Sequence, residues 1–113
     1  MELDEVRRFA LGLPETTEEP HFEKASFRVR GKIFVTVPED GGHLHVLVDE
    51  GEARACVASD PAWCEELWWG KRLTGVRVTL AGAPADLVRE LVEDAWRRKA
   101  PKRVVAEFDS SRL

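Results

Sequence analysis

Arginine and lysine side chains recur at outward positions of two stretches that read as β-strands. Residues 26–30 and 76–80 alternate polar with apolar side chains, so the two kinds lie on opposite faces of a strand. Cations on such a face can contact the phosphates of a nucleic acid, and neighbouring aromatic rings can stack on its bases. The candidate nucleic-acid-binding residues are Arg28, Arg30, Lys32, Lys71, Arg72 and Arg77, with Trp68 and Trp69 beside them.

These cations also have a purely structural interpretation. Outward strand positions must be polar, arginine is the commonest cation of this chain, and tryptophans usually fill cores. A net charge of −4 argues against strong non-specific DNA binding, although residues 61–113 carry ten basic and eight acidic side chains. Residues 97–103 hold five of those cations, which suits either a second binding patch or an ordinary helix C-terminus.

Metal and covalent chemistry have less support in the residue pattern. His43 and His45 are two apart on an expected strand, so both point to one face, as a metal site needs, but no third ligand can be named. No signature joins a cysteine or serine to a base, and neither glycine-rich phosphate motif occurs. We therefore expect a protein without catalytic residues, metal or cofactor.

The cysteines and the composition indicate the cellular environment in which the protein works. Cys56 and Cys64 are too few for a disulfide scaffold, which leaves two semi-buried thiols or one Cys56–Cys64 disulfide. The N-terminus has no signal-peptide pattern and no apolar run is long enough to cross a membrane, so we expect a cytoplasmic protein. The absence of Asn and Gln suits a hot environment, but a GC-rich genome also disfavours Asn, so both explanations stay open.

The elements that must position these residues follow from the hydrophobic periodicity. Helices are expected over residues 3–12, 50–59, 85–99 and 101–109, and strands over 26–30, 33–37, 43–48, 68–69 and 76–80. Residues 14–25 and 70–75 read as loops, and 62–67 as a helical turn. The pattern predicts one domain, residues 1–113, of the α+β class: two layers, with an antiparallel sheet of about five strands and helices on one face.

The order and spacing of several segments resemble the MmcQ/YjbR-like family, small bacterial proteins named for DNA binding through a double-wing motif. The matching segments are ALGLPE at 10–15, FRVRGKIF at 27–34, WGKR at 69–72, DAWR at 94–97 and APKRVVAEFD at 100–109. The chain departs from the family at Leu73–Gly75, where members often carry a tryptophan, and at Ala95-Trp96, where many have Ser-Tyr. The resemblance implies an α-β(3)-α-β(2)-α fold and DNA binding, and it brings no catalytic residues.

Three functions follow from these observations. The first is a nucleic-acid-binding module that uses the six cations named above. The second is a protein-interaction domain, such as a homodimer through the sheet face or an edge strand, because Phe34 and Leu47 are expected on an otherwise polar face. The third is a small-molecule pocket around Trp63, Trp68 and Trp69.

Overall fold

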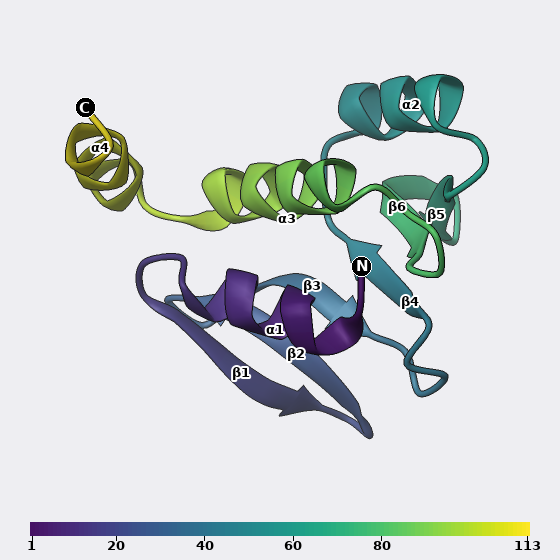
Figure 1. Cartoon of the computed structure of the whole chain (residues 1–113), viewed down its shortest axis with the longest axis horizontal. Coiled ribbons are helices and arrows are strands. Elements are labelled where there is room, and N and C mark those ends of the chain that lie inside the picture. Colours follow the sequence, from purple (N-terminus) through teal and green to yellow (C-terminus); the bar gives the residue numbers. More distant parts are fainter.

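Six antiparallel strands form one open sheet in the computed structural model, which describes residues 1–113 (Figure 1). The strands are β1 (Thr16–His21), β2 (Lys24–Val29), β3 (Lys32–Val37), β4 (His43–Val46), β5 (Cys64–Trp69) and β6 (Arg72–Thr79). The helices are α1 (Leu3–Leu11), α2 (Glu50–Ser59), α3 (Ala85–Lys99) and α4 (Lys102–Ser111). The strand order is β1-β2-β3-β4-β6-β5, and the predicted α+β class is confirmed.

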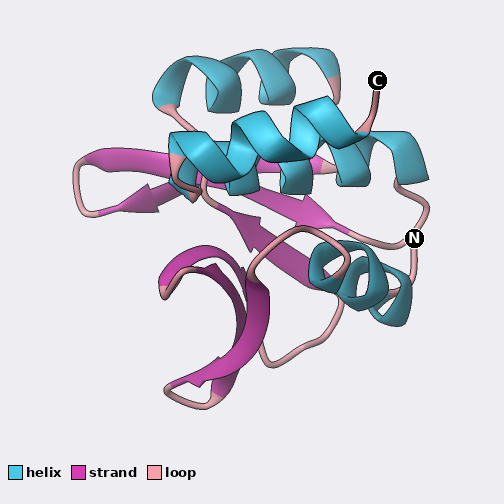
Figure 2. Cartoon of the chain, turned by 90° about the vertical axis from the view of Figure 1, so that its left-hand side faces the viewer, coloured by secondary structure: helices cyan, strands magenta, loops and turns pink.

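The helices and the strands occupy opposite sides of the molecule (Figure 2). Cross-strand neighbours Phe27, Val35, Val46 and Val76 form one buried row through β2, β3, β4 and β6. The longest helix, α3, presents its own apolar stripe to this core. One face of the sheet is therefore packed, and the other carries no helix; we call the latter the helix-free face.

Trp96 packs α3 against the segment after α1 and against α4. Its side chain is fully buried, and its indole Nε1 donates a hydrogen bond of 3.0 Å to the carbonyl oxygen of Pro14. The ring also meets Phe108 of α4 edge-on, with 5.0 Å between centroids. The Arg97 and Arg112 guanidinium groups lie 5.5 and 4.5 Å from the Phe108 ring centre, so aromatic and cation–π contacts together hold α4.

The prediction that residues 14–25 form a loop is wrong, because Thr16–His21 is strand β1. It pairs antiparallel with β2 from Thr16↔Val29 to His21↔Lys24. The strand shows no apolar alternation because it is an edge strand with mostly exposed side chains. An edge also tolerates Pro20, whose missing N–H faces no neighbouring strand.

The β5–β6 hairpin also departs from the prediction. Residues 64–67, expected in a helical turn, belong to β5, and most of the expected loop 70–75 belongs to β6. Only Gly70 and Lys71 form the turn, where Gly70 has φ +59°, a conformation that glycine adopts without strain. These two changes lengthen two expected strands, whereas the sixth strand of the sheet is β1.

Phe34 was expected on the outer face and is instead completely buried in the core. The β2–β3 pairing shifts register, so that Phe27 lies opposite Val35 and Arg28 opposite Ile33. Phe34 is the extra residue of this β-bulge, and both it and Val35 are buried. A partner surface on the outer face therefore cannot include Phe34.

Gly75 allows β6 to pass against the end of β4. A Cβ atom at this position would lie 2.0 Å from the carbonyl oxygen of Val46 and 3.1 Å from Cα of Leu47. No side chain fits at that distance from a backbone carbonyl. The close approach of the two strands therefore requires glycine.

Alanine at position 75 tests this approach. We expect Gly75→Ala to lower the free energy of unfolding by about 3 kcal/mol, because backbone must shift to admit the methyl group. Gly51→Ala is the matched control, since a Cβ there meets only the Asp49 carboxylate at 3.5 Å, in the first turn of α2. Urea unfolding should show the control unchanged or slightly stabilised. Equal midpoints for Gly75→Ala and the parent would contradict the close approach.

Candidate functional site on the helix-free face

A single row of side chains crosses the helix-free face through all six strands. The strand registers place its members side by side in the order Glu19, Ser26, Thr36, His45, Arg77 and Glu65. Ser26 is fully buried within the row, and its hydroxyl donates to the carbonyl oxygen of Glu19 at 2.7 Å. The row is polar throughout, in contrast to the apolar row on the packed face.

Arg77 is the only arginine of the row, and its charge is balanced by neighbouring carboxylates. Its guanidinium lies 3.4 Å from both the Asp40 and Glu65 carboxylates, and 2.8 Å from Nε2 of His45. Burial and the neighbouring Arg77 charge lower the pKa of His45, so the imidazole is neutral near pH 7 and accepts the Arg77 hydrogen bond. Arg77 lies on the outer face as predicted, but acids already surround it.

The two histidines considered as metal ligands have separate partners. His43 Nδ1 lies 3.1 Å from the Asp40 carboxylate, while His45 contacts the Arg77 guanidinium. A fixed positive charge beside His45 opposes a metal cation there. The structure also contains no group of three or more His, Cys, Asp or Glu side chains that could hold a metal ion.

A cavity of about 240 Å³ opens on the helix-free face, and we call it the sheet hollow. Its lining is drawn from all six strands and the segment after β4: His21, Lys24, Thr36, His45, Leu47, Leu67, Trp68, Trp69 and Thr74. His21 belongs to the β1 edge and the tryptophans to the β5 edge, so the sheet curls until both edges border one cavity. Trp69 is 82% exposed and Trp68 48% exposed, although such rings normally pack inside.

The predicted cations fall into distinct positions. Lys32, Lys71 and Arg72 lie at one end of the sheet, where β3 and β6 begin, and none of them forms an ion pair. Arg28 donates to the Ser26 hydroxyl and the Pro20 carbonyl without any carboxylate partner. All four are therefore available to an anionic ligand.

Arg30 does not lie on a strand face, contrary to its expected alternation. It follows β2 in the turn to β3 with φ +51°, and its guanidinium forms an ion pair with Glu15. That short contact lowers the pKa of Glu15 and keeps both groups charged. Arg30 is thus the candidate cation most fully neutralised by a single neighbour.

The polar lining residues His21 and Lys24 were missed from the sequence, and one tryptophan was misplaced. His21 and Lys24 were overlooked because their segment was read as a loop, and the edge strand offers no alternation that would reveal them. Trp63 was grouped with Trp68 and Trp69, yet it does not line the hollow. It packs against the core, with its indole nitrogen near Gly82.

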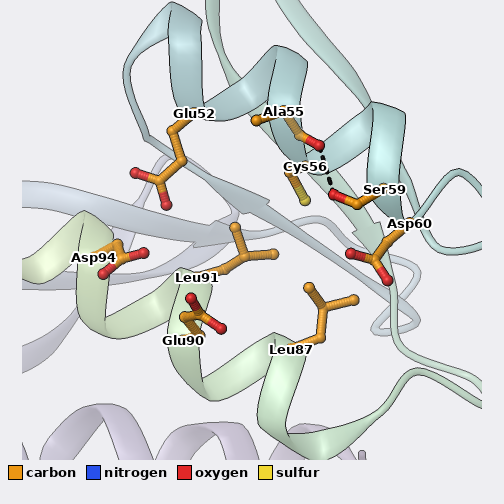
Figure 3. A pocket seen from close by; sticks show the side chains of 9 residues that line it. All are labelled: Glu52, Ala55, Cys56, Ser59, Asp60, Leu87, Glu90, Leu91 and Asp94. Atoms are coloured by element: carbon orange, nitrogen blue, oxygen red, sulfur yellow. Dashed lines mark hydrogen bonds between the residues drawn. The ribbon is translucent and has the colours of Figure 1, made fainter.

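A second cavity, of about 260 Å³, lies between α2 and α3, and we call it the acidic cleft. Four carboxylates surround it, from Glu52, Asp60, Glu90 and Asp94 (Figure 3). Burial, followed by a hydrogen bond with Asp94, raises the pKa of Glu52 to about 7. No basic side chain lines the cleft, so it repels a nucleic acid.

The chain belongs to the YjbR family, whose family model matches residues 11–98. The resemblance to MmcQ/YjbR-like proteins is thereby confirmed. The crystal structure of Deinococcus radiodurans protein DR2400, which has a DUF419 domain, is similar with a TM-score of 0.72. The two share 22% sequence identity over 84% of this chain and 75% of that chain, a likeness that shows the common fold.

No curated protein gives a sequence match to the chain. None of the four helices combines the length and the apolar composition needed to cross a membrane.

The raised pKa of Glu52 predicts how stability depends on pH. Between its ordinary value near 4.5 and about 7, the folded protein retains a proton that the unfolded chain releases. Unfolding is therefore easier as pH rises through that window. Glu52→Gln cannot ionise, so we expect its melting temperature to exceed that of the parent by a few degrees at pH 8, an advantage that shrinks at pH 4.

Circular dichroism melts at the two pH values measure this difference. Glu107→Gln is the control, because Glu107 is an exposed carboxylate on α4, away from the acidic cleft. The control should shift the melting temperature equally at pH 4 and pH 8. A pH-independent effect of Glu52→Gln would contradict the buried, proton-sharing position.

Proposed function

We propose that this protein is a binding module for single-stranded nucleic acid, DNA in the first place, without catalytic activity of its own. The observation that carries the proposal is the sheet hollow, where exposed Trp68 and Trp69 border the same cavity as Lys24 and His21. A base stacked on an indole contributes roughly 1–3 kcal/mol, and any base can do so. The lysine is positioned for the adjoining phosphate.

The small number of unpaired cations supports a small binding site of modest affinity. Lys24, Lys71 and Arg72 have no ion-pair partner, while Arg30 and Arg77 are balanced by carboxylates. A chain of net charge −4 attracts phosphate only locally. We therefore favour unpaired strands, whose bases are free to stack, over duplex DNA, which presents only its backbone and groove edges. The family resemblance implies the same class of ligand.

A homodimer is the second candidate, because apolar rings are exposed at both sheet edges. Phe22, in the turn after β1, is 90% exposed, and Trp69 at the end of β5 is 82% exposed. Unpaired edge strands can also add to the edge of another copy. Light scattering across a concentration series tests this candidate, and a monomer at every concentration counts against it.

Fluorescence anisotropy with labelled oligonucleotides tests nucleic-acid binding. We expect single-stranded DNA to bind in the tens-of-micromolar range at low salt, and more tightly than duplex of the same length. Trp69→Ala should weaken binding about 5- to 150-fold, the equivalent of about 1–3 kcal/mol. With about three phosphate contacts, log K should fall against log salt with a slope near −2.

Two lysine variants separate the hollow from the other basic cluster. Lys24→Ala removes a cation that lines the hollow, whereas Lys102→Ala removes an exposed, unpaired cation on α4. Lys24→Ala should weaken binding and reduce the salt slope, while Lys102→Ala should leave both unchanged. Absence of binding at low salt refutes the function, and equal losses in the two variants would move the site to residues 97–103.

A further inference from the structure

Cys56 and Cys64 meet in the interior from two different elements. Cys56 lies on α2 and Cys64 begins β5, and both are almost fully buried as free thiols. Their Sγ atoms are 3.0 Å apart, with the Cys56 thiol donating a hydrogen bond to the Cys64 sulfur. A disulfide needs about 2.05 Å between the sulfurs, so a movement of about 1 Å would join them.

One of these sulfurs is reachable from the surface. Cys56 lines the acidic cleft, where its sulfur points toward the cavity between α2 and α3 (Figure 3). Cys64 does not line that cavity and lies behind Cys56. A small neutral oxidant can enter a cleft of about 260 Å³, whereas a bulky anionic thiol reagent meets its four carboxylates.

We propose that Cys56 and Cys64 form a reversible redox pair, which a peroxide closes to an intramolecular disulfide linking α2 to β5. The Cys56 sulfur attacks one peroxide oxygen, the O–O bond breaks, and water leaves, so that Cys56 becomes a sulfenic acid. The Cys64 sulfur then attacks the Cys56 sulfur, and the hydroxyl departs with the Cys64 proton as a second water. Two thiols are oxidised and one hydrogen peroxide is reduced to two waters.

The surroundings determine the rate of this reaction. Burial raises the pKa of both thiols, and the Asp60 carboxylate adds to the effect on each. Glu52 of α2 faces the same region, and Glu90 and Asp94 approach it from α3. Since the thiolate is the reactive form, oxidation is slow at pH 7 and accelerates about tenfold per pH unit.

Mass spectrometry of the whole protein tests the pair directly. The reduced protein is treated with hydrogen peroxide, quenched, unfolded and alkylated. The expected product is a monomer that has lost two hydrogens, takes up no alkylating groups and regains both thiols with dithiothreitol. A disulfide that closes the short loop between Cys56 and Cys64 should raise the melting temperature by roughly 5–10 °C.

Single-cysteine variants provide the control. Cys64→Ala leaves Cys56 without a partner, so peroxide should add oxygen to it and the melting temperature should not rise; Cys56→Ala should leave Cys64 reacting more slowly. The proposal is overturned if the parent keeps two alkylatable thiols, gains oxygen on both, or forms only disulfide-linked dimers. The parent assay needs no substitution, so it decides the question even where a variant is unstable.

Discussion

The close passage of β6 against the end of β4 is the constraint on which the rest of the domain depends. At Gly75 the two backbones approach so nearly that a Cβ would lie 2.0 Å from the Val46 carbonyl oxygen. This approach lets the β5–β6 hairpin continue the sheet while the sheet curls. The curl brings the tryptophans of one edge and the His21 side of the other edge around the same hollow. Without it, the face would offer a flat row of polar side chains.

Charge is distributed so that the two cavities differ in character. Acids neutralise Arg77 on the helix-free face and Arg30 in the β2–β3 turn, which leaves Lys24, Arg28, Lys71 and Arg72 without a carboxylate partner. Between α2 and α3, four carboxylates gather with no cation lining the cavity. Within a net charge of −4, the acidic cleft therefore disfavours polyanions, whereas the lining of the sheet hollow includes Lys24 and no carboxylate.

The helices could be predicted from the sequence because their signals are local. Asp49 caps α2 by accepting a hydrogen bond of 2.8 Å from the Glu52 amide, and both α2 and α3 span the expected residues. Of the edge strands, β1 was missed and β5 was expected only over residues 68–69, because both are rich in acids and are selected by their partners rather than by alternation. The bulge at Phe34 likewise depends on pairing with β2, which no local pattern records.

The same reasoning explains what was found and missed in the candidate site. Alternation correctly placed Arg28 and Arg77 outside, because the period of a strand is a local property. It could not place Lys24 and Trp69 at the same cavity, since that arrangement arises only when a six-stranded sheet curls.

Strand β5 links the interior of the domain to the sheet hollow. It begins at Cys64, in contact with α2, and ends at Trp69, exposed on the opposite face, with a register shift between Leu67 and Trp68. One short strand thus connects the paired thiols of the interior to the sheet hollow, so a covalent link at its first residue would restrain the strand that carries both tryptophans.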